Sequence, residues 1–274
     1  MRIITHLGAI GALLLSASAL AAPVPWAVLP PSSEPVRFGG VADMDDVGKP
    51  GAMMYTGPGL AGVLAAVATH GIIVGAMHKS QKNEIRLAAD QVVAPYAASL
   101  ATFSQRDLLH AASSLANSGA PRWLDAAESA DDISILSNAA TFEMTQDRST
   151  LILQSEVNVT RPGKQPPYSN VIRVVGHPHS RDDLATYWGA DEAKALKDES
   201  ARLLALSIDI ALSEAHGSSD AGAGPQRTVR FREGNREVFE RATVIGEQCD
   251  RLLIRNLRGW IMSVPRSKPD CARP

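Results

Sequence analysis

The chain has 274 residues, of which 45% are hydrophobic and 20% are charged, with a formal net charge of −2. This balance allows one or two hydrophobic cores and excludes the strongly basic surface that nucleic-acid phosphates attract. Aromatic residues make up only 5% of the chain, too few to build stacking platforms for bases. We therefore expect a globular protein without a nucleic-acid partner.

The N-terminus has the pattern of an export signal. Arg2 precedes an apolar core over residues 7–15, and the small residues Ala19 and Ala21 fit the rule for cleavage after Ala21. Residues 1–21 are therefore predicted to be a signal peptide that exports the chain to the periplasm or the cell-envelope membrane. The alternative interpretation is an uncleaved membrane anchor.

A second apolar segment follows a spacer. Residues 22–56 are rich in Pro and Gly, which disfavours a helix and predicts an extended spacer. Residues 57–77 carry no charge and match a bilayer in length, but His70 and several glycines make this segment a poor span by itself. We expect a membrane-associated helix. The alternative, favoured by Lys79 and Lys82, is a single-pass inner-membrane protein with a cytoplasmic C-terminal domain.

Small residues recur in the segment 57–77 at a spacing of one helical turn. Gly71 and Gly75 form a Gly-x-x-x-Gly pair, and Gly62 with Ala66 repeats the small-x-x-x-small pattern. On a helix, residues spaced in this way lie on one ridge and allow a second backbone to approach closely. We predict that the segment packs against the membrane or another helix, including that of a second copy in a homo-oligomer.

In this respect the segment resembles the glycine-zipper segments of bacterial envelope proteins. The whole arrangement of signal, Gly-rich segment and a folded domain ending in RGWIMSVP is similar to that of uncharacterised exported proteins of proteobacteria. Such proteins carry no agreed activity, so the resemblance implies an exported protein and transfers no site residue.

Helical periodicity follows the Gly-rich segment, and residues 78–120 are predicted to form a helical arm. Ser104 and Asp107 have the spacing of a capping box, which predicts that a helix begins directly after Ser104.

The C-terminal half of the chain mixes strand patterns with one long helix. Alternation predicts a hairpin around a turn at Asp147, a third strand over 169–176 and a meander of strands near the C-terminus. A helix is predicted from about Asp191 to His216. Together these elements predict an α+β domain over 125–274, with the helix packed across an antiparallel sheet.

The segment GHPHSRDD carries the candidate catalytic or metal-binding residues. His177 and His179, with Asp182 or Asp183, can supply two imidazoles and a carboxylate to Zn²⁺ in a metal-dependent hydrolase. Ser180 to Asp183 also has the spacing of a helix cap, so our first interpretation is a strand end followed by a helix start. That interpretation involves no cofactor and no catalytic residue.

Two further features lie near the C-terminus. We interpret Arg251, Arg255 and Arg258 as the solvated face of a sheet, the alternative being a surface for an anionic partner such as a phospholipid headgroup. Cys249 and Cys271 are predicted to form a disulfide because the chain is predicted to be exported, and two free thiols are the alternative.

The sequence contains none of the common nucleophile or phosphate-loop motifs in a suitable context. We therefore expect a non-enzymatic protein of the bacterial cell envelope, whose periplasmic α+β domain binds an unknown envelope protein. The alternative function is the metal-dependent hydrolase.

Overall fold

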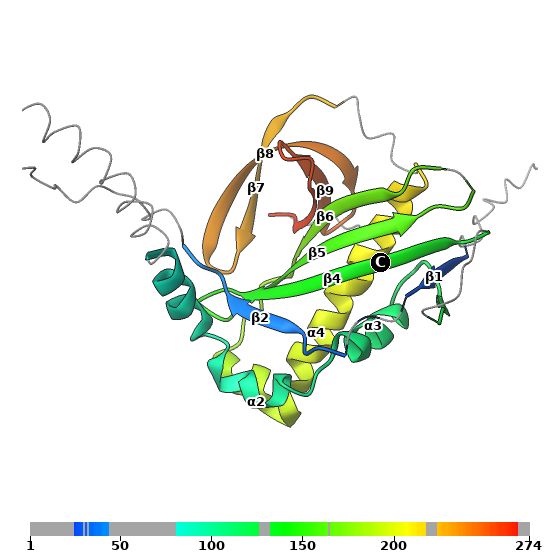
Figure 1. Ribbon diagram of the computed structural model, residues 1–274. Helices are drawn as coiled ribbons and strands as arrows, with labels where there is room; N and C mark the ends of the chain where they lie inside the picture. The colour runs from blue at the N-terminus through cyan, green and yellow to red at the C-terminus, as the bar shows by residue number, and fades with distance from the viewer. Residues whose placement is uncertain are drawn as a thin grey trace, which may run out of the picture.

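The computed structural model describes residues 25–29, 31, 33–43, 81–125, 132–163, 165–217 and 224–267. Within them, ten strands form one sheet and the helices pack against it (Figure 1). The strands are β1 (Trp26–Val28), β2 (Arg37–Gly40), β3 (Arg122–Trp123), β4 (Ser134–Met144), β5 (Leu151–Thr160), β6 (Tyr168–Val175), β7 (Arg227–Glu233), β8 (Arg236–Glu247), β9 (Arg251–Asn256) and β10 (Ile261–Pro265). The helical elements are residues 81–90, the short 3₁₀ helix η1 (Ala94–Tyr96), α2 (Ala97–Leu100), α3 (Gln105–Ser113) and α4 (Leu184–Ala215).

The sheet is mixed, which corrects the expectation of an antiparallel sheet. Its strand order is β3-β1-β4-β5-β6-β10-β9-β8-β7, and β2 also pairs with β4. β4, β5 and β6 are antiparallel, as are β7 to β10, whereas β6 and β10 are parallel. The parallel pair arises because the chain leaves β6 through α4, builds the outer strands first and returns beside β6 with β10. The α+β class with a long helix packed on the sheet is confirmed.

The stretch expected to be a spacer contributes two strands. β1 and β2 run parallel to β4, and β1 also pairs with β3. The Trp26 side chain of β1 is buried, and its indole Nε1 donates to the carbonyls of Ser118 and Gly119 at 3.2 and 3.1 Å. Pro residues exclude a helix here, as expected, but they permit short strands at the edge of a sheet.

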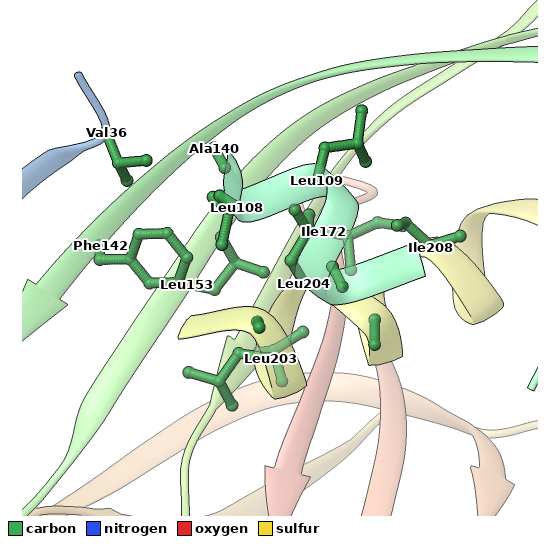
Figure 2. Packing of buried hydrophobic residues seen from close by; sticks show 14 of the residues in the cluster. Val36, Leu108, Leu109, Ala140, Phe142, Leu153, Ile172, Leu203, Leu204 and Ile208 are labelled. Carbon is green, nitrogen blue, oxygen red and sulfur yellow. The ribbon is translucent and has the colours of Figure 1, made fainter. Parts of the chain in front are cut away.

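α4 and α3 cover one face of the central strands (Figure 1). Apolar residues alternate along β4 and β5, so that one side of each strand points into this interface. Figure 2 shows this core, in which the labelled residues are Val36, Leu108, Leu109, Ala140, Phe142, Leu153, Ile172, Leu203, Leu204 and Ile208.

The opposite face of the sheet is covered by its own outer strands. Ile152 of β5 and Val175 of β6 point away from α4 and pack in a second core with Phe231 of β7, Ile254 of β9 and Val264 of β10. The strands β7, β8 and β9 therefore curve over the sheet on the side that α4 leaves open (Figure 1).

Asp147 connects the curved strands to the central hairpin. Its carboxylate accepts hydrogen bonds from the Thr145 hydroxyl at 2.6 Å, from the Ser149 backbone N–H at 3.0 Å and hydroxyl at 3.0 Å, and from the Asn235 backbone N–H at 2.7 Å. Asn235 lies in the β7–β8 turn. Gly234, with φ of +63°, precedes it, and a Cβ there would come within 2.6 Å of the carboxylate. Glycine thus permits both the turn and the approach.

The helices begin largely where local signals place them, with one exception. The Ser104 side chain and Asp107 form the predicted capping box of α3. α4 begins earlier than expected, at Leu184, and its two parts meet at a kink where Asp191, Glu192 and Ala193 all have positive φ. Such left-handed backbone is unfavourable for these residues, so packing on both sides must hold the kink in place.

We predict that Asp147→Ala lowers the free energy of unfolding by about 1–3 kcal/mol at neutral pH, because buried donors lose their acceptor. Burial alone would raise the pKa of Asp147, but the hydrogen bonds from Thr145, Ser149 and Asn235 outweigh it and lower this pKa. The stabilisation is therefore present above the unfolded-state pKa and is lost as pH falls through the folded-state pKa.

Urea unfolding of the wild type and the variant across pH measures this effect. Asp198→Ala is the control, because Asp198 forms only an exposed pair with Lys194 on α4. The control should change stability by less than about 0.5 kcal/mol. A difference between wild type and Asp147→Ala that stays constant as pH falls would contradict the role assigned to the carboxylate.

Candidate functional site

A cleft of about 460 Å³ lies between α4, the segment 176–183 that joins β6 to α4, and the start of β9. The segment leaves the sheet at Gly176, whose backbone N–H donates to the Leu151 carbonyl at 2.9 Å. A Cβ at Gly176 would lie 2.7 Å from that carbonyl oxygen. The close approach therefore fixes where the segment turns toward α4.

The two predicted histidines both line this cleft, but they face different partners. The His177 Nε2 atom lies 3.0 Å from the Asp250 carboxylate, and both side chains are about half exposed. The His179 ring packs against Tyr187 and Trp188, with ring centroids 5.4 and 4.8 Å apart. Burial lowers the pKa of His179, so its imidazole is neutral at pH 7.

The two predicted carboxylates lie outside the cleft lining. Asp183 caps α4 by accepting a hydrogen bond from the Thr186 backbone N–H at 3.0 Å, and hydrogen bonding from Thr186 lowers the pKa of this carboxyl. Asp182 is exposed beside it. Over the described residues, no group of three or more His, Cys, Asp or Glu side chains is placed to hold a metal ion. The segment is a strand exit and a helix cap, but the capping residue is Asp183 and not Ser180, because α4 begins at Leu184.

One face of α4 forms a wall of the cleft. Glu199, Arg202, Leu203 and Leu206 follow the i, i+3, i+4, i+7 spacing that places residues on one side of a helix. The Arg202 Nε atom donates to Glu199 at 3.1 Å. The wall therefore combines an ion pair at its rim with apolar side chains below.

Arg251 forms the floor of the cleft, and its burial corrects part of our interpretation of a solvated arginine face. The residue is only 8% exposed. Its Nε atom donates to the Ser263 hydroxyl at 2.8 Å. Its Nη2 atom donates to the carbonyls of Val175 and Ser263 at 2.7 and 2.9 Å. Arg255 pairs with Glu214 of α4 at 2.7 Å. Of the three arginines interpreted as a solvated face, Arg258 is exposed, whereas Arg251 and Arg255 lie on the side of β9 that α4 covers. The sequence does not reveal this cover.

Several predicted residues lie outside the described ranges. They are the helix-packing residues Gly62, Ala66, Gly71 and Gly75, together with Cys271. Cys249 lies between β8 and β9, and its pairing with Cys271 stays a prediction. Within the ranges that the structure describes, no helix combines the length and the apolar character needed to cross a membrane.

Comparison with known proteins adds no family. No family model matches the chain, and no curated protein matches it. A solved structure titled "Crystal structure of uncharacterized protein" is similar at 12% identity, covering 69% of this chain and 94% of that chain with a TM-score of 0.26. A likeness at this level carries no argument about function.

We predict that EDTA leaves the unfolding temperature unchanged and that the purified chain carries no stoichiometric Zn²⁺. The physical reason is that His177 faces Asp250 while Asp183 caps a helix, so the candidate ligands do not converge. Elemental analysis and thermal unfolding with and without EDTA are the measurements. One equivalent of Zn²⁺ that disappears in the His177→Ala, His179→Ala double variant would instead support the metal-dependent hydrolase.

Proposed function

We propose that this chain is a non-enzymatic protein of the bacterial cell envelope that associates with the membrane, or with another helix, through residues 57–77. Its folded domain lies in the periplasm and binds a partner there. The order of segments carries the proposal: an export-type N-terminus precedes a small-residue apolar segment, and a folded domain follows.

The cleft beside α4 supports a binding role for the domain. It brings together side chains from α4, the segment 176–183 and β9, which are separated in sequence. Its Glu199 carboxylate pairs with Arg202, and its Asp250 carboxylate lies beside His177. Polar groups positioned by neighbours around an apolar wall are typical of ligand-binding clefts.

We predict that a C-terminal fusion to alkaline phosphatase is active in cells, because this reporter needs the oxidising periplasm to form its disulfides. The control is the same fusion without residues 1–21, which should be inactive. If the fusion is inactive and a green fluorescent protein fused at the same position is bright, the domain faces the cytoplasm. That outcome would favour the single-pass alternative.

We predict that the Gly71→Leu, Gly75→Leu double variant releases the chain from the membrane fraction or reduces its oligomeric size. Leucine side chains on the small-residue ridge prevent the close approach of a second backbone. Fractionation and size-exclusion chromatography are the measurements. The control Ile73→Leu changes an apolar residue that the predicted helix would place on the side opposite Gly71 and Gly75, and it should behave as the wild type. Unchanged fractionation and unchanged size of the double variant would contradict the packing role.

A further inference from the structure

The floor of the cleft holds a cation that makes no direct ion pair with a described carboxylate. Arg251 has no Asp or Glu oxygen within ion-pair distance among the described residues, although its side chain is 8% exposed. Its Nε and Nη2 atoms donate to Ser263 and Val175. A guanidinium has five N–H donors, and the two on Nη1 donate to no described residue. Burial lowers the pKa of Arg251, and the charges of Asp250 and Glu199, which lie beyond ion-pair distance, offset this only in part. The floor of the cleft therefore still favours an anion that accepts a hydrogen bond from Arg251.

The Nη1 atom of Arg251 also retains some solvent exposure. It makes no hydrogen bond to a described residue. It is also not one of the fully buried polar atoms that lack a partner among the described residues. Arg251 lines both the cleft and the smaller neighbouring cavity beside Leu253, and its free Nη1 donors can serve a molecule bound against it.

The remaining charges around the cleft leave an excess of one positive charge. Glu199 pairs with Arg202, and Asp250 contacts His177. The guanidinium of Arg181 lies 4.3 Å from the centroid of the Tyr187 ring and has no described carboxylate partner. The lining therefore holds three guanidiniums, those of Arg181, Arg202 and Arg251, and two carboxylates. This excess matches a ligand with a single negative charge.

The shape of the cleft adds an apolar requirement. Leu203 and Leu206 of α4 and the ring of Tyr187 form its apolar wall. Its volume of about 460 Å³ lies within the range of small-molecule sites in proteins. The wall can cover a short hydrocarbon body, while the arginines contact the charged group.

We propose that this cleft binds a small organic carboxylate, whose head group accepts hydrogen bonds from Arg251 at the floor and from Arg181 and Arg202 at the rim. Its apolar body lies along Leu203 and Leu206. A planar carboxylate suits the paired donors of a guanidinium. The two resident carboxylates, Glu199 and Asp250, disfavour a more highly charged anion such as phosphate. This inference rests on the proposed binding role of the domain and is independent of its location in the cell.

Titration of the purified full-length chain with sodium hexanoate tests the proposal. We expect saturable heat in calorimetry and a rise in unfolding temperature, because a ligand that binds the native state stabilises it. Hexanol and hexylamine, which share the hydrocarbon body, should give neither signal. No saturable binding of hexanoate, or equal binding of hexanol, would overturn the proposal.

Arg251 also holds β6 and β10 together, so the decisive variant changes the rim. The Arg181→Gln, Arg202→Gln double variant replaces exposed side chains and should weaken hexanoate binding by about tenfold or more. The matched control is Arg106→Gln, an exposed arginine on α3 outside the cleft lining, which should bind as the wild type does.

Two results would contradict the assignment. Equal affinity of the wild type and the rim variant for hexanoate would place binding elsewhere. Inorganic phosphate is the second test ligand. If phosphate binds the wild type as tightly as hexanoate does, and this binding is lost in the rim variant, the site recognises charge alone. That result would overturn the choice of a carboxylate. A cytoplasmic result from the reporter fusion would change the location of the domain and leave these outcomes as they are.

Discussion

One helix cannot cover both faces of a wide sheet, and the architecture follows from this constraint. α4 and α3 bury the face of β4, β5 and β6 that carries residues such as Phe142 and Leu153. The opposite face of β5 and β6 carries further apolar side chains, including those of Ile152 and Val175. With no described helix on that side, the outer strands curve over it and supply Phe231. Burial of both faces therefore requires a bent sheet.

The same bend produces the cleft. β9 lies two strands from β6, where the sheet has begun to curve away from α4. Near the C-terminal end of α4, the ion pair between Arg255 and Glu214 connects this helix directly to β9. One turn earlier along the helix, Leu206 and Ile210 line a smaller cavity with Leu253. At the start of β9, Asp250 and Arg251 line the larger cleft together with Glu199 of α4.

Local signals in the sequence predicted local structure well. The capping box at Ser104, the hairpin around Asp147 and the third strand each depend on residues that are close together in the chain. The strands β1 and β2 were missed because they are short, follow prolines and join β4 in parallel, a contact between distant parts of the chain. The bulge at Gly246 within β8 was missed for the same reason, since only the partner strand β9 defines this irregularity.

The site was predicted in part, and Arg251 and Arg255 show why. Both lie on the same face of β9, as alternation requires, and both meet α4. Arg255 faces Glu214 and forms an ion pair. Arg251 hydrogen-bonds to Ser263 and Val175, and the Glu199 and Asp250 carboxylates act on it only from beyond ion-pair distance. Two arginines with the same sequence pattern therefore differ in the property that matters for binding, a direct ion-pair partner. That property depends on which side chains of α4 face each arginine, and periodicity along a strand does not encode this.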